Sequence, residues 1–270
     1  MFRLLRLSAL ILLLAVHPAL AQRRTVNGLG LRPNLQAEYA LHGDDYVLVG
    51  ISTPLSTGGY QGLNLDRLGL NAGYEHFWNA RWSAGATLGA DAYTATRNGG
   101  DVLYLFLDAR PELFGRHWNT IGSFNFRQRL GVEYQVLGGP GSQNRALTSL
   151  RLDLDRLIPL GRLALRPRLA YEARAYLRLQ RDETQEKERV IDFGTLRAEL
   201  GVRVSPRFDF TPWVASQTTY LNTIPQFDAN NNQISGGRTN VVTPVVGLDL
   251  RLTLFRGGTV FERRQLPTQH

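Results

Sequence analysis

The stretch RLALRPRLAYEARAYLRLQ, residues 162–180, decides the fold class of this chain. Apolar side chains occupy most odd positions from Leu163 to Leu179, and arginine or glutamate occupies most even positions. Successive side chains of a β-strand point to opposite faces, so this alternation predicts a long strand with one apolar and one charged face. At helical spacing the same residues would spread charge around the whole cylinder, which argues against a helix.

The same two-residue period recurs along most of the chain. Ten segments show it, namely 162–180 and 35–52, 63–78, 82–94, 102–113, 121–137, 146–158, 190–204, 208–221 and 241–255. Many are longer than the roughly five or six residues usual in soluble sheets, and a tilted strand needs about 9–11 residues to cross a bilayer. The pattern predicts an all-β fold, an antiparallel up-and-down transmembrane β-barrel of about ten strands.

Short and long connections alternate between these segments. Short turns are expected near 79–80, 115–116, 159–160 and 205–206, and longer polar loops at 54–62, 96–101, 138–144, 181–189 and 222–240. Outer-membrane barrels have short periplasmic turns and longer outer loops, and loops of this length are often functional, which makes 181–189 and 222–240 candidates for binding a partner in an envelope complex. We interpret Gly43 as a bulge within the first strand. A turn there would add a strand, and twelve strands are the alternative count.

The first residues predict export. Arg3 and Arg6 precede a short apolar run, and Ala19-Leu20-Ala21 matches a cleavage site, so 1–21 is expected to be a signal peptide. We divide the rest into a periplasmic N-terminal lead at 22–33, an outer-membrane barrel at 34–256 and a C-terminal tail at 257–270. The 270 residues include no cysteine, which excludes disulfides and thiolate metal sites. No metal or other cofactor is expected.

Aromatic residues help to distinguish a membrane barrel from a soluble one. Four tryptophans, Trp78, Trp82, Trp118 and Trp213, lie close to expected short turns. Tryptophan concentrates at membrane interfaces because its ring is apolar while its N–H can hydrogen-bond. We therefore expect these residues to form an interfacial girdle in contact with outer-membrane lipid. A soluble barrel plugged by aromatic hairpins is the alternative.

The charged face is expected to line the barrel interior, because a charge against lipid near the midplane costs about 2–4 kcal/mol. If the chain turns at 159–160, Asp153 lies opposite Arg166 and Arg151 lies beside Arg168. The expected lumen residues are Arg127, Arg129, Glu133, Arg151, Asp153, Arg166, Arg168, Glu172, Arg174, Arg197, Glu199, Arg203 and Arg251. They predict either a structural network that fills a small barrel or a narrow pore that prefers small anionic solutes.

Catalysis is the less favoured alternative, and we expect that this barrel is not an enzyme. The chain contains no G-x-S-x-G, H-E-x-x-H or P-loop motif. Only His42 with Asp44 and Asp45 resembles an acid/base group. The formal net charge of +8 suggests nucleic-acid binding, but the arginines alternate with leucine along strands instead of forming a patch, so no nucleic-acid partner is expected. The oligomeric state is left open.

Three segments resemble the outer-membrane β-barrel proteins of the Bacteroidota type that have no assigned function. They are LNAGYEHFWNARW at 70–82, FRQRLGVEY at 126–134 and LRAELGVRV at 196–204, each of which ends at a tryptophan, turn or loop. The resemblance covers essentially the whole chain after the signal peptide and implies location and architecture only. Many such barrels end on an aromatic residue of the closing strand, whereas here Phe255 is followed by a tail.

Overall fold

The computed structural model describes residues 23–41, 45–57, 62–79, 81–96, 103–139, 141–161, 163–178, 189–205, 207–231 and 233–255. The expected signal peptide and C-terminal tail lie outside these residues, as do His42, Gly43 and Asp44. No helix among the described residues is long and apolar enough to cross a membrane.

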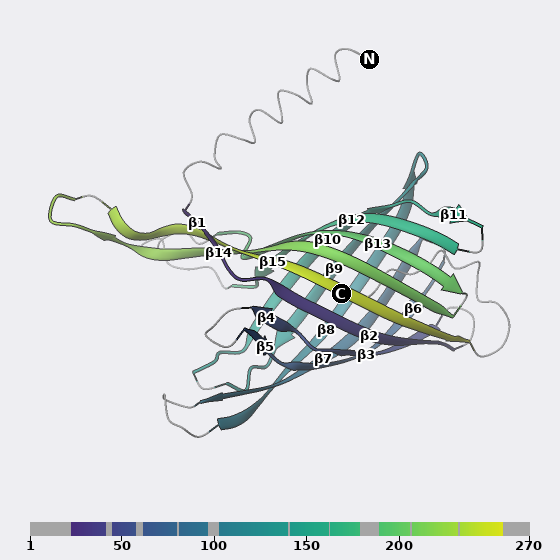
Figure 1. Cartoon of the computed structure of the whole chain (residues 1–270), viewed down its shortest axis with the longest axis horizontal. Coiled ribbons are helices and arrows are strands. Elements are labelled where there is room, and N and C mark those ends of the chain that lie inside the picture. Colours follow the sequence, from purple (N-terminus) through teal and green to yellow (C-terminus); the bar gives the residue numbers. More distant parts are fainter. Residues whose placement is uncertain are drawn as a thin grey trace, which may run out of the picture.

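All regular elements of the described residues are strands. They are β1 (Arg23–Val26), β2 (Gly30–Ala40), β3 (Asp45–Ser52), β4 (Leu55–Thr57), β5 (Leu63–Leu65), β6 (Leu68–Phe77), β7 (Trp82–Thr96), β8 (Leu103–Ile121), β9 (Phe124–Gln135), β10 (Arg145–Asp155), β11 (Ile158–Leu160), β12 (Leu163–Tyr176), β13 (Phe193–Ser205), β14 (Phe208–Phe227) and β15 (Gln233–Phe255). Eleven of them close into a barrel, while β1, β4, β5 and β11 lie outside it (Figure 1). The predicted β-barrel is confirmed.

The barrel closes through a parallel pair. β2 runs parallel to β15, from Gly30 beside Val245 to Ala40 beside Phe255, and every other pair of neighbouring barrel strands is antiparallel. β2 also pairs antiparallel with β3, so the chain reverses between Ala40 and Asp45. The bulge interpretation of Gly43 is therefore wrong: residues 35–52 form two strands, which raises the count to eleven.

An odd number of strands places the first and last barrel strands in the same direction. β2 therefore starts at the end of the barrel that carries the longer connections, and β15 finishes at the opposite end. The expected lead at 22–33 needs correction, because it contains β1, which pairs with β15 at Thr239–Val242, and the first residues of β2. The barrel begins at Gly30 rather than at 34.

Two short turns lie elsewhere than predicted. β8 continues through 115–116 to Ile121, and the chain turns at Gly122, which has a φ of 61°. The turn expected at 159–160 lies at Gly161, which also has a φ of 61°, and Leu160 pairs with Leu163 across it. Glycine adopts positive φ at little cost, so it determines where these two-residue turns form.

The segment 222–240 is mostly strand and not the loop that we predicted. β14 extends to Phe227, and β15 begins at Gln233. The two strands remain paired from Phe208 opposite Leu252 out to Phe227 opposite Gln233. In Figure 1 this hairpin projects beyond the barrel wall at the end where β1 lies.

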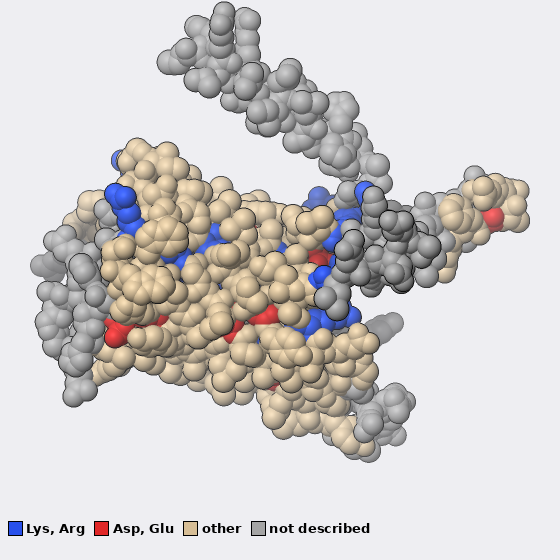
Figure 2. Space-filling model, turned by 180° about the vertical axis from the view of Figure 1, so that it is seen from behind, with Lys and Arg blue, Asp and Glu red and all other residues tan. Residues whose placement is uncertain are grey.

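The barrel wall is apolar outside and charged inside. In β10, Leu150, Leu152 and Leu154 are exposed, whereas Arg151 and Asp153 are buried. Along the described barrel strands, no outward position between the rims carries Asp, Glu, Lys or Arg. Figure 2 shows a broad surface of uncharged residues from behind, with charged residues visible only in small patches.

Candidate functional site in the barrel interior

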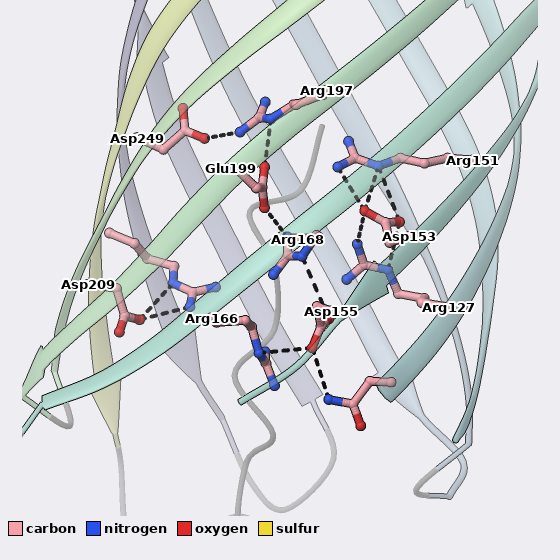
Figure 3. A network of polar contacts seen from close by, with 12 residues as sticks. Arg127, Arg151, Asp153, Asp155, Arg166, Arg168, Arg197, Glu199, Asp209 and Asp249 are labelled. Atoms are coloured by element: carbon pink, nitrogen blue, oxygen red, sulfur yellow. Dashed lines mark hydrogen bonds and ion pairs between the residues drawn. The ribbon is translucent and has the colours of Figure 1, made fainter. Parts of the chain in front are cut away.

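The interior is crossed by a network of paired charges that we call the lumen belt. It comprises Glu38, Arg127, Arg151, Asp153, Asp155, Arg166, Arg168, Arg197, Glu199, Arg203, Asp209, Asp249 and Arg251. Most of these side chains are buried, and Figure 3 shows ten of them by name projecting from the wall toward one another. The two-residue period brings them together, since alternate residues of each strand face inward.

Asp153 binds two arginines. Its Oδ1 lies 2.7 Å from Nη2 of Arg127 on β9 and 3.0 Å from Nη2 of Arg151 on its own strand. The Asp153 side chain is completely buried. A buried carboxylate between two guanidinium groups is stabilised by charge-assisted hydrogen bonds, which are roughly twice as strong as neutral ones.

The network continues from β10 to β12 and β13. Asp155 forms ion pairs with two arginines of β12, with Oδ1 lying 3.2 Å from Nε of Arg166 and Oδ2 lying 3.7 Å from Nε of Arg168. Arg168 also pairs with Glu199 on β13, which in turn accepts Nε of Arg197 at 2.6 Å. The planar guanidinium fork lets one arginine bridge two carboxylates on different strands.

The last part of the lumen belt ties β13 to β15. Arg197 reaches past β14, so that its Nη2 lies 2.6 Å from Oδ2 of Asp249 on β15. Asp209 of β14 accepts hydrogen bonds from Nη2 of Arg251 at 2.8 Å and from Nε of Arg203 at 3.3 Å. Arg251 also lies 3.9 Å from Glu38 on β2, so the charges reach the parallel seam that closes the barrel.

A second charged group lies on the β6 to β9 side. Arg116 pairs with Glu75 at 2.8 Å, and Ser83 donates to the same carboxylate at 2.6 Å. Arg129 pairs with Glu112 at 2.8 Å. The guanidinium carbons of Arg116 and Arg129 lie 4.7 and 4.5 Å from the ring centroid of the buried Phe114, which adds cation–π attraction.

The candidate lumen residues all lie on the inward face. Arg127, Arg129, Arg151, Asp153, Arg166, Arg168, Arg197, Glu199 and Arg251 are buried, whereas Glu133, Glu172, Arg174 and Arg203 are partly exposed. Glu133 and Arg174 pair with each other at 2.7 Å. Arg151 lies directly opposite Glu172.

The predicted register between β10 and β12 is wrong. Asp153 lies opposite Ala170 instead of Arg166, and Arg168 lies opposite Asp155. The cause is the turn at Gly161, which moves the alignment by four residues. A shift by an even number leaves every side chain on its expected face, so the predicted charged lining formed with different partners.

Sequence reasoning missed several inward-facing carboxylates and arginines, Arg110 paired with Asp91 at 2.7 Å among them. Four inward-facing carboxylates pair with arginines, namely Glu38, Glu75, Glu112 and Asp209. Arg116 is the partner of Glu75. Each shares the parity of its strand's charged or small residues, which was the signal available. The signal is weak in β6, where glycines, Asn71 and Phe77 occupy the other inward positions.

The expected tryptophan girdle divides into two groups. Trp78 and Trp82 face outward at the β6–β7 turn with 63% and 50% of their surface exposed. Trp118 does not belong with them, because it lies on the inward parity of β8 and stacks on Phe77, with ring centroids 5.4 Å apart. Trp213 is also wrongly assigned, since it is only 7% exposed.

Trp213 packs inside the barrel because a neighbouring glycine leaves room for it. It lies opposite Gly247 on β15, where an added Cβ would overlap the indole ring. The guanidinium of Arg197 lies over the ring at 3.9 Å from its centroid. Trp213, which we expected at the membrane interface, thus packs inside the barrel against Arg197 of the lumen belt.

The buried charges show no excess of arginine. Ten carboxylates and eight guanidinium groups are buried among the described residues. The arrangement supplies many short ion pairs between neighbouring strands, and carboxylates hold the arginines that the sequence suggested for anion binding. No known protein family matches the chain, and neither a curated protein nor a solved structure matches it.

Proposed function

We propose that this protein is an outer-membrane β-barrel whose role is structural or accessory, with a lumen closed by the lumen belt. The observation that carries the proposal is the inverted distribution of polarity: the outer wall is apolar and the interior holds the paired charges. A soluble protein would place this wall against water, whereas lipid is the solvent that it suits.

The strand dimensions support the same conclusion. β10 has 11 residues. At about 3.4 Å per residue and a tilt of about 45°, a strand of this length spans about 26 Å, close to the apolar band of about 25 Å in outer-membrane barrels. Export through the expected signal peptide and the resemblance to Bacteroidota barrels favour the outer membrane over other bilayers.

Charge balance favours a closed structural lumen over an anion-preferring pore. Anion-selective pores present rings of uncompensated arginine or lysine. Here Arg127, Arg151, Arg166, Arg168 and Arg197 all contact carboxylates at the wall. An arginine that coordinated a passing anion would have to leave its carboxylate. Breaking a buried ion pair in this way would cost about 3–5 kcal/mol.

Two measurements test the proposal. The protein should remain in the membrane pellet after alkaline extraction, and its release into the soluble fraction would overturn the membrane location. In a planar bilayer with a salt gradient, the refolded protein should insert without stable conductance. Stable openings with a reversal potential that shows anion preference would instead establish the pore, and Arg166→Gln with Arg174→Gln would then weaken that preference.

A further inference from the structure

Three arginines at the short-turn rim differ from those of the interior. Arg81 precedes β7, Arg156 follows β10 and Arg207 precedes β14, and all three are exposed. None of them forms an ion pair with a described residue, and Cζ of Arg156 lies 5.9 Å from the centroid of the Phe124 ring. Their charge is therefore uncompensated within the described rim.

The carboxylates near this rim are already engaged. Asp45 lies 2.6 Å from Nδ1 of His76 and accepts the hydroxyl of Tyr74 at 2.8 Å. Asp155 and Asp209 point into the lumen, where they pair with arginines of the lumen belt. The outer part of the described rim thus carries positive charge, while the interior beside it is balanced.

The three arginines are spread around the barrel and do not form a patch. In the strand order, β7 and β10 are separated by two strands, as are β10 and β14. A compact ligand or a peptide would contact one of these positions at a time. A planar layer of charged groups surrounding the barrel contacts all of them together.

The outer wall beside the rim completes an interface with lipid. Trp78 and Trp82 are exposed at the β6–β7 turn, next to Arg81, and the apolar wall begins directly beyond them. An arginine beside such a wall can lay its methylene stem along apolar surface while its guanidinium reaches the phosphate layer. Each basic residue near an anionic membrane surface contributes about 1 kcal/mol of attraction.

We propose that the short-turn rim binds the headgroups of anionic phospholipids through Arg81, Arg156 and Arg207. This inference rests on the proposed membrane location and adds the lipid class that the rim selects. The expected preference is for phosphatidylglycerol over phosphatidylcholine, because the choline group compensates the phosphate charge that the arginines attract. Screening should weaken the preference as ionic strength increases.

Tryptophan quenching measures this preference at the correct end of the barrel. The protein is refolded into vesicles that contain phosphatidylglycerol or phosphatidylcholine with brominated acyl chains, and the relative binding constant is taken from the two quenching curves. Trp78 and Trp82 face the lipid, whereas Trp118 and Trp213 lie on the inward face and contribute a constant background. We expect phosphatidylglycerol to bind about fivefold more strongly, from about 1 kcal/mol at each arginine.

A pair of triple variants tests the rim arginines, and the quenching of Trp78 and Trp82 reports the lipid beside Arg81. In Arg81→Gln/Arg156→Gln/Arg207→Gln the binding ratio should fall to about one. The control Arg24→Gln/Arg145→Gln/Arg238→Gln makes the same charge change at exposed arginines near the opposite end and should retain the preference. Heat-modifiable electrophoretic mobility confirms that each variant has folded.

The outcomes separate this inference from the proposed function. Equal quenching by both lipids in the unmodified protein would place the barrel in the bilayer but overturn the headgroup preference. A preference that persists in the first triple variant, or that disappears in the control, would also overturn the assignment to these arginines. Absence of quenching by either lipid would overturn the membrane proposal and this inference together.

Discussion

The most informative single perturbation is Asp153→Asn, because one carboxylate binds two buried arginines. The substitution keeps the size of the side chain but removes the charge that pairs with Arg127 at 2.7 Å and Arg151 at 3.0 Å. Both guanidinium groups are almost fully buried. Breaking a buried pair by removing one partner costs about 3–5 kcal/mol, so we expect the free energy of unfolding to fall by that amount.

Urea titration of the protein refolded in lipid vesicles measures this change, with the folded fraction read from heat-modifiable electrophoretic mobility. Asp45→Asn provides the matched control, since Asp45 is 33% exposed and pairs with a histidine at the rim. That change should cost less than about 1 kcal/mol. A double-mutant cycle with Arg151→Gln should give a coupling energy of about 0.5–3 kcal/mol. A loss at Asp153 no larger than the control would refute the view that the lumen belt stabilises the barrel.

Three further perturbations test the packing, the outer wall and a turn. Gly247→Ala should destabilise the protein by about 1–3 kcal/mol, because the new Cβ meets the indole of Trp213. In the control Gly115→Ala the new Cβ has no neighbour within 4 Å and should not incur this packing cost. Equal urea midpoints for the two variants would contradict the packing of Trp213 against Gly247. Leu130→Arg places a charge on the outer wall, where the leucine is 59% exposed. In vesicles this change should lower the free energy of unfolding by about 2–4 kcal/mol, but by much less if the wall faced water. An unchanged free energy of unfolding in vesicles would argue against a lipid-facing wall. Gly161→Ala must adopt a φ of 61° and should cost about 1–2 kcal/mol with Gly161→Asn milder, and an unchanged unfolding curve for the alanine variant would argue against a left-handed turn.

Much of the interior was predictable because parity survives errors of register. The alignment of β10 with β12 differs from the prediction by four residues, yet Arg151, Asp153, Arg166 and Arg168 all face inward as expected. A strand that slips by an even number keeps its faces, whereas its cross-strand partners change. The faces therefore follow from the local pattern, and the ion pairs do not.

The tryptophans show where the local pattern is insufficient. Proximity to an expected turn suggested an interfacial position for Trp118 and Trp213, but both lie on the inward parity of their strands. An aromatic ring can pack on either face when a small neighbour provides space, and Gly247 does so for Trp213. Gly247 lies on the neighbouring strand β15, opposite Trp213, and the few residues around Trp213 in the sequence do not reveal this pairing.

The amino-acid sequence by itself determined that this chain forms long strands with one apolar and one charged face, because the pleat places alternate side chains on opposite sides of a strand. Only the tertiary structure decided that eleven strands close through a parallel pair of β2 and β15. It also decided which carboxylate pairs with each buried arginine, so that the buried charges show no excess of arginine. Closure and the ion pairs between different strands depend on contacts between residues far apart in the chain, and a two-residue period carries no information about them.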